Sequence, residues 1–183
     1  MSDNAVYKIV SNAVVAAIYF VVTYLSTPIA FGQIQVRIAE ALILLCFFRK
    51  DFWIGLTFGC LLINCTSPLG WPDILFGTAA TLISSLLVAY ASPCLLLAII
   101  YPVIANAFVV GAELYFIQEL PFWINVAYVG LGELVAVSLG YIFFMLAAGL
   151  AQLFPSPFCA RILTSRSITT TRTFIRKRSI LDA

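Results

Sequence analysis

The segment FGQIQVRIAE, residues 31–40, carries an arginine and a glutamate inside an otherwise apolar part of the chain. An arginine, lysine or aspartate at the centre of a membrane helix costs about 2.5–3.5 kcal/mol, so such a residue is expected to face a cavity or a partner. Arg37 and Glu40 are three residues apart, which places them on one helical face and allows them to pair. Four further acids lie near or within later apolar segments: Asp73, Glu113, Glu119 and Glu133. These residues predict a polar functional site within apolar surroundings.

The composition is that of a polytopic membrane protein. Of 183 residues, 63% are apolar and 10% are charged, and the mean hydropathy is +1.07. Soluble domains contain about 45–50% apolar and 25% charged residues. The charge is also uneven along the chain. Residues 1–160 contain four basic and seven acidic side chains, whereas residues 161–183 contain six basic and one acidic.

Turn residues and charges divide the apolar sequence into six expected helices. The expected helices are residues 5–25, 34–48, 52–64, 73–91, 94–116 and 123–153, with a kink at Pro102 in the fifth. The second and third are shorter than the roughly 20 residues that a spanning helix needs. Gly55 and Gly59 have the GxxxG spacing that favours close packing between helices. We therefore predict an all-α membrane domain over residues 1–153, followed by a basic, disordered cytoplasmic tail over residues 154–183.

The distribution of basic residues predicts the orientation of these helices. An even number of spans puts both termini on one side, and lysine and arginine in short connections mark the cytoplasm. Lys8, Arg49, Lys50 and the basic tail all fall on the side of the termini. The opposite connections, 26–33, 65–72 and 117–122, contain no lysine or arginine. Both termini are therefore predicted to be cytoplasmic.

With this topology, five different helices carry polar residues into the outer half of the membrane. The residues expected to converge there are Arg37, Glu40, Asn64, Asp73, Asn106, Glu113, Asn125 and Glu133. Buried charges need partners or water, and one arginine cannot neutralise four acids. We expect an outward-facing pocket that leaves carboxylates for a ligand. Two tryptophans, Trp71 and Trp123, are expected either to anchor the chain at the interface or to stack on this ligand.

Such a pocket favours a planar ligand that is cationic or rich in hydrogen-bond donors. A carboxylate accepts two hydrogen bonds from a guanine-like edge as it does from a guanidinium. An inorganic cation is disfavoured because the acids do not form a dense cluster. The chain contains no histidine, and its five cysteines are scattered, so neither a metal site nor a bound cofactor is expected.

Four segments of the chain resemble one known family. The segments are QIQVRIAEAL, DILFGTAATL, NAFVVGAEL and VGLGEL. Their order along the chain and their places on the expected helices resemble those of the queuosine-precursor transporter family QueT. The resemblance covers about residues 8–153. Members are substrate-binding S components of energy-coupling factor (ECF) transporters in the bacterial plasma membrane. The basic segment beyond Leu153 departs from the family pattern, and no family function is carried onto it.

The resemblance implies a six-helix S-component fold with cytoplasmic termini and a lid formed by residues 26–33. It implies that Ala13 and Ala17 dock on the membrane-embedded coupling subunit, while two ATPase subunits drive toppling of the S component. The implied substrates are 7-deazaguanines with a cyano or an aminomethyl group. Within this hypothesis, Glu113 and Glu133 bind the base edge beside Asn106 and Asn125. Arg37 and Glu40 either touch the substrate or position the lid, and Asp73 is a weaker candidate.

Three alternatives stay open at the level of sequence. The first is an S component for another purine, a pterin or another vitamin, and the second is a stand-alone proton-linked carrier. The third, a small intramembrane enzyme, is disfavoured because the sequence has no histidine, no nucleophile elbow and no metal-ligand cluster. No nucleotide-binding P-loop occurs either, so the energy for transport is expected to come from other chains or an ion gradient.

Overall fold

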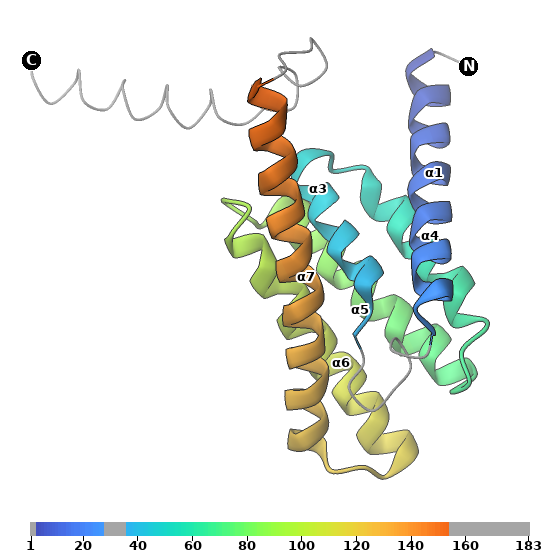
Figure 1. Cartoon of the computed structure of the whole chain (residues 1–183). Coiled ribbons are helices and arrows are strands. Elements are labelled where there is room, and N and C mark those ends of the chain that lie inside the picture. Colours follow the sequence, from blue (N-terminus) through green and yellow to red (C-terminus); the bar gives the residue numbers. More distant parts are fainter. Residues whose placement is uncertain (1–2, 28–35, 154–183) are drawn as a thin grey trace, which may run out of the picture. The chain divides into compact units, whose positions relative to one another are not determined.

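The computed structural model describes residues 3–27 and 36–153. Every regular element in these residues is a helix (Figure 1). The elements are α1 (Asp3–Leu25), η1 (Ile38–Leu44), α3 (Leu45–Phe48), α4 (Phe52–Asn64), α5 (Trp71–Tyr90), η2 (Leu97–Ile99), α6 (Ile100–Gln118) and α7 (Phe122–Leu153). The prediction of an all-α protein is confirmed.

Four of the helical segments are long and apolar enough to cross a membrane. They are Ala5–Leu25, Trp71–Tyr90, Leu95–Gln118 and Phe122–Ala147. Two shorter apolar segments, Ile38–Phe48 and Phe52–Asn64, correspond to the two short helices expected from the sequence. A helix of 13 residues such as α4 is about 20 Å long, which is less than the roughly 30 Å hydrocarbon core. The short helices therefore depend on their longer neighbours for shelter.

The chain divides into two compact units, Met1–Ile142 and Phe143–Ala183. The first unit contains every residue predicted for the functional site. The described part of the second unit is the C-terminal end of α7. The expected lid, residues 26–33, lies mostly outside the described residues, and the basic tail lies wholly outside them. The expected domain boundary at residue 153 and the disorder of the tail therefore stay predictions.

The second predicted helix differs from the expectation in its geometry. Arg37 has an extended backbone (φ −87°, ψ 90°), residues Ile38–Leu44 form a 3₁₀-helix, and α3 adds only four α-helical residues. Because a 3₁₀-helix has three residues per turn and poorer hydrogen-bond geometry, such a run is uncommon and often marks a functional segment. Arg37 lies before the first helical turn, so the helical spacing to Glu40 does not set its direction.

The kink expected at Pro102 falls where a 3₁₀ turn joins an α-helix. The 3₁₀ turn η2 precedes α6, which begins at Ile100. Pro102 lies in the first turn of α6, directly after this change of helix type, and a bend at this residue stays a prediction.

Small residues bring the helices of the first unit close together. Helix α1 lies beside α4 (Figure 1). A Cβ added to Gly55 would lie 2.5 Å from the Asn12 carbonyl oxygen, and one added to Gly59 would lie 2.8 Å from that of Ala16. This confirms the close packing predicted from the GxxxG spacing. Helices α6 and α7 approach in the same way, because a Cβ at Gly111 would lie 2.7 Å from Val126 Cγ2.

Basic residues gather at the end of the first unit where α1 begins. Arg49 donates a hydrogen bond to Ser11 Oγ at 3.3 Å and lies over the ring of Tyr7. Lys50 lies over the ring of Tyr90, at the end of α5. This gathering agrees with the predicted topology, in which that end faces the cytoplasm.

Candidate functional site

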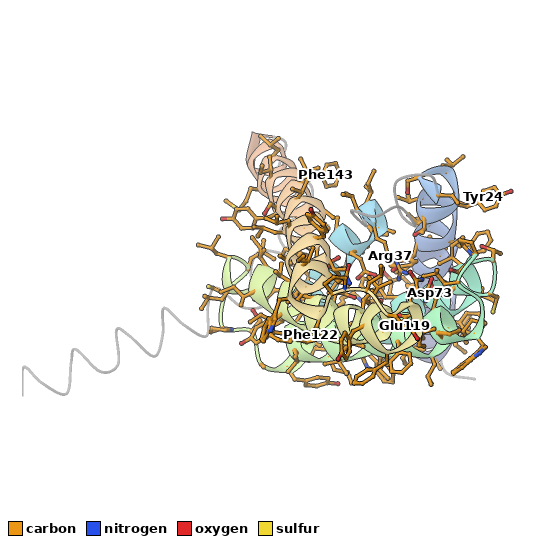
Figure 2. The ribbon with its side chains drawn as sticks, turned by 90° about the horizontal axis from the view of Figure 1, so that it is seen from below. Tyr24, Arg37, Asp73, Glu119, Phe122 and Phe143 are labelled. Atoms are coloured by element: carbon orange, nitrogen blue, oxygen red, sulfur yellow. The ribbon has the colours of Figure 1, made fainter. Side chains whose placement is uncertain are left out.

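The centre of the site is an ion pair between Arg37 and Asp73. Arg37 Nη2 lies 2.8 Å from Asp73 Oδ1, and the two side chains are 5% and 0% exposed. Figure 2 shows both residues in the interior, whereas Tyr24 lies at the edge of the molecule. The predicted pairing of Arg37 with Glu40 is thus incomplete, because Arg37 interacts electrostatically with Glu40 but forms its ion pair with Asp73. The extended backbone at Arg37 lets its side chain reach the first turn of α5 instead.

Gly77 makes room for this ion pair on α5. A Cβ at this position would lie 2.8 Å from both Asp73 Oδ1 and Asn64 Nδ2, and 3.2 Å from Arg37 Nη1. Asn64, at the end of α4, donates a hydrogen bond to the Asp73 carbonyl oxygen at 3.0 Å. The guanidinium is thus held against the backbone of α5, in a space that any side chain at residue 77 would occupy.

Glu40 belongs to a second polar group, on the side of α1. It is fully buried, and its Oε1 accepts hydrogen bonds from Tyr19 Oη and from Thr81 Oγ1, the latter at 2.9 Å. Its Oε2 has no hydrogen-bond partner among the described residues. Glu40 therefore ties α1 and α5 to the 3₁₀-helix that follows Arg37.

Glu113 on α6 and Glu133 on α7 complete the set of buried acids. They are 2% and 3% exposed. Within the described residues, neither carboxylate oxygen of Glu113 has a hydrogen-bond partner. Oε1 of Glu133 also has none in these residues. Glu113 interacts electrostatically with Asp73 and Arg37, and Glu133 interacts with Glu40 and Arg37. The acids from separate helices thus surround one arginine.

Two asparagine side chains were also predicted for the site. Asn106 lies close to Glu133, and Asn125 lies at the start of α7. Asn106 interacts with the carboxylate of Glu133 and also donates to its own helix, at Pro102 O. Asn125 is 8% exposed and donates to Pro121 O, at the start of α7. Asn106 therefore joins the buried group, while Asn125 has a local hydrogen bond of its own.

The remaining predicted positions lie on the outside of the described chain. Trp71 and Trp123 are 68% and 73% exposed, as interface anchors are, and their contact with a ligand stays a prediction. Glu119 is exposed and adopts a left-handed conformation (φ 57°) after α6. It therefore does not join the other acids. No group of three or more His, Cys, Asp or Glu in the described residues could hold a metal ion.

Tyr19, Thr81 and Gly77 are parts of the site that were not predicted. Tyr19 looks like one more aromatic residue of an apolar helix, and nothing in the residue pattern indicates its buried hydrogen bond. The other two carried a usable signal. Gly77 and Thr81 follow Asp73 at intervals of four and eight residues, which places all three on one helical face.

A separate groove runs along the seam between α1 and α4. Its volume is about 780 Å³, and its walls are almost entirely apolar. Ala13 and Ala17 line it and are exposed, whereas Ala16 is buried beside Gly59. The small-residue face predicted for the first helix is thus open to a partner.

Apolar spanning helices around a buried group of charges and amides define an integral membrane protein with a polar interior site. The profile of the QueT transporter family matches residues 9–148, and the chain belongs to this family. It is 30% identical over 159 residues to the queuosine precursor transporter QueT of Lactococcus lactis subsp. cremoris (strain MG1363), which covers 76% of this chain and 91% of that protein. No solved structure matches the chain. The protein is therefore a transporter of the bacterial plasma membrane.

Proposed function

We propose that this chain is the substrate-binding S component of an ECF-type importer and that it binds a queuosine precursor of the 7-deazaguanine class. The observation that carries the proposal is the pair of buried acids, Glu113 and Glu133, whose carboxylates keep oxygens without hydrogen-bond donors in the described residues. A buried carboxylate of this kind is costly unless a partner satisfies it. The name of the Lactococcus relative supports a queuosine precursor as that partner.

The chemistry of a deazaguanine suits these groups. Its ring N–H and exocyclic amino group form a pair of donors, which one carboxylate can accept together. The carboxamide of Asn106 interacts with Glu133. The carboxylate of Glu133 and the amide of Asn106 are therefore available together to bind the edge of a base. We therefore assign the base edge to Glu133 and Asn106.

Calorimetry on the purified full chain tests this assignment. The wild type should bind 7-aminomethyl- or 7-cyano-7-deazaguanine, whereas Glu133→Gln should bind about 10- to 100-fold more weakly, because a hydrogen bond to a charged group contributes about 1.5–3 kcal/mol. Glu119→Gln is the matched control, since this acid is exposed outside the site. Absence of binding of either base to a folded wild type would overturn the proposed substrate class. Tight binding of a pterin or another purine would then favour a different vitamin carrier.

The groove between α1 and α4 supports docking on a membrane-embedded coupling subunit. In lipid, close approach of helices depends on small residues because there is no hydrophobic drive between them. Ala13 and Ala17 supply such a surface on α1, and the apolar groove continues onto α4. In the proposed cycle, two ATPase subunits bound to the coupling subunit drive toppling of the loaded S component and release of the base inside.

Co-purification with the coupling and ATPase subunits tests the docking. Ala13→Leu with Ala17→Leu should abolish both capture of the complex and ATP-dependent uptake, while leaving base binding by the isolated chain intact. Ala127→Leu makes the same kind of substitution at an exposed alanine of α7 and should change neither. Uptake that continues without the ATPase subunits would contradict the proposal and favour a stand-alone carrier.

A further inference from the structure

The groove between α1 and α4 faces lipid for as long as no partner protein covers it. Its volume of about 780 Å³ falls in the range of about 300–1,000 Å³ that sites for small molecules have. Five of the large apolar side chains that line it are 42–58% exposed: Ile9, Val21, Ile54, Phe58 and Leu62. The hydrocarbon core of a bilayer holds no water that could fill such a space. An acyl chain is therefore the material available to fill the groove in the undocked protein.

The length of the groove matches the depth of one leaflet. The groove runs along α1 from Lys8 to Val21, a distance of about 20 Å at 1.5 Å per residue. Half of the hydrocarbon core is about 15 Å thick. One acyl chain can therefore lie along the groove from the headgroup region to the middle of the bilayer. The predicted topology makes this leaflet the cytoplasmic one.

A basic residue lies where the headgroup of such a lipid would be. Lys8 lines the groove at the end where α1 begins, and its side chain is exposed. Its ammonium group forms no ion pair or hydrogen bond with the residues whose side chains the structure describes. Asp51, an acid at the same end, already accepts hydrogen bonds from Arg49 and Asn12. Lys8 is therefore available to a phosphate group.

We infer that, in the undocked protein, this groove binds an anionic phospholipid of the cytoplasmic leaflet. Its acyl chain lies between α1 and α4, and its phosphate meets Lys8. Apolar contacts give little preference among lipids, since lipid tails are as apolar as the walls of the groove. Basic residues at the cytoplasmic surface attract anionic headgroups, and basic pockets between membrane helices bind them. The headgroup therefore selects the lipid, and the groove determines where its chain lies.

Such a lipid should regulate the docking proposed above. Ala13 and Ala17 line the groove, so the acyl chain and a coupling subunit would compete for the same surface. A ligand that binds the undocked form alone stabilises that form by mass action. Anionic lipid should therefore delay docking. This consequence rests on the proposed function, whereas the lipid site itself does not.

Native mass spectrometry of the full chain in detergent tests the lipid site. The protein is mixed with equal amounts of phosphatidylglycerol and phosphatidylcholine that have the same acyl chains. The wild type should retain the anionic lipid about fivefold better, equivalent to about 1 kcal/mol, and Lys8→Gln should bring this ratio close to one. Lys50→Gln is the matched control, because Lys50 is exposed at the same end but does not line the groove. It should leave the ratio unchanged.

A second variant tests the place of the acyl chain. Ala13→Leu with Ala17→Leu narrows the groove and should lower the retention of both lipids, whereas Ala127→Leu on α7 should not. Size-exclusion chromatography checks that the double variant is folded. If it is not folded, the comparison of Lys8→Gln with Lys50→Gln decides the inference.

The contrary outcomes are distinct. Equal retention of both lipids by the wild type would overturn the inference. An equal loss in Lys8→Gln and Lys50→Gln would also overturn it, because it would indicate diffuse attraction to the basic end. Unchanged retention by a folded double variant would place the lipid outside the groove and overturn it as well.

The competition has its own test. Capture of the coupling and ATPase subunits should fall as phosphatidylglycerol replaces phosphatidylcholine in mixed micelles, and should fall less for Lys8→Gln. Capture that does not respond to the lipid would overturn the competition but not the lipid site. Absence of capture at every lipid composition would overturn the proposed docking, again without touching the lipid site.

Discussion

Tyr19 of α1 donates a hydrogen bond to Glu40 of η1, and both side chains are fully buried. This contact connects two parts of the molecule with different proposed roles. Ala16, three residues before Tyr19 on α1, lines the groove between α1 and α4. Glu40 lies three residues after Arg37, which forms the ion pair with Asp73. Tyr19 is therefore a direct link between the proposed docking helix and the segment that positions the arginine of the site.

We predict that Tyr19→Phe lowers stability and weakens substrate binding without removing it. Among the described residues, loss of this donor leaves Glu40 with the hydrogen bond from Thr81, and a buried group deprived of a partner costs about 1–3 kcal/mol. Thermal unfolding in detergent and calorimetry measure the two effects. Tyr24→Phe is the control, because Tyr24 is 59% exposed on the same helix. Equal melting temperatures of the two variants would contradict a stabilising role for the Tyr19 hydroxyl.

The two Arg–Asp ion pairs of the described chain should differ in their contribution to stability. The pair Arg37–Asp73 is buried, whereas the side chains of Arg49 and Asp51 are 30% and 27% exposed. Removing one member of a buried pair costs about 3–5 kcal/mol because a charge is left behind, but an exposed pair contributes about 1 kcal/mol or less. Asp73→Ala should therefore lower the apparent melting temperature far more than Asp51→Ala. Similar shifts would show that water or other groups compensate Arg37.

The sequence predicts the helices well because hydropathy reports directly on burial in lipid. The bounds of α4 match the expected range 52–64, and those of α5 and α7 differ by no more than two residues. The burial of Asp73, Glu113 and Glu133 was also expected, because an ionisable residue within a membrane helix is costly unless it faces the protein interior or a cavity. These features are local properties of the chain.

The ion pair between Arg37 and Asp73 could not be predicted from hydropathy. Arg37 was expected to be able to pair with Glu40 because three-residue spacing places neighbours together on an α-helix, but the backbone at Arg37 is extended and the segment after it is a 3₁₀-helix. Its partner, Asp73, is 36 residues away. Such a choice depends on how α4 and α5 pack, and on the absence of a side chain at Gly77. Hydropathy contains no information about either.

Gly77→Ala should disrupt the site by crowding it. The new Cβ would lie 2.8 Å from Asp73 Oδ1 and 3.2 Å from Arg37 Nη1, distances at which the ion pair must shift. We expect substrate binding to fall by at least about tenfold, equivalent to 1.4 kcal/mol, as measured by calorimetry. Gly130→Ala is the control because its Cβ would make an ordinary contact, 3.4 Å from Ala107 Cβ. A folded Gly77→Ala protein with wild-type affinity would show that this packing does not constrain the ligand.

The partly exposed pair Arg49–Asp51, at the predicted cytoplasmic end, should respond to pH. Partial burial alone would raise the pKa of Asp51, but the hydrogen bonds and charge of Arg49 outweigh this and hold the pKa below its usual range. A carboxyl with a lowered folded-state pKa stabilises the protein above its unfolded pKa of about 3.9, and this contribution is lost as the pH falls through the folded pKa.

We therefore predict that wild type and Asp51→Asn differ by about 1 kcal/mol or less in unfolding free energy at pH 7, given the exposure of the pair. The difference should shrink as the pH falls below about 4 and vanish once the folded carboxyl is protonated. Melting curves of both proteins across this range measure it. Lys50→Gln, which removes a neighbouring charge outside the Arg49–Asp51 pair, should give an offset that does not close at acid pH. A gap between wild type and Asp51→Asn that widens on acidification would contradict the stabilising role of the pair, because a lowered folded-state pKa can only narrow it.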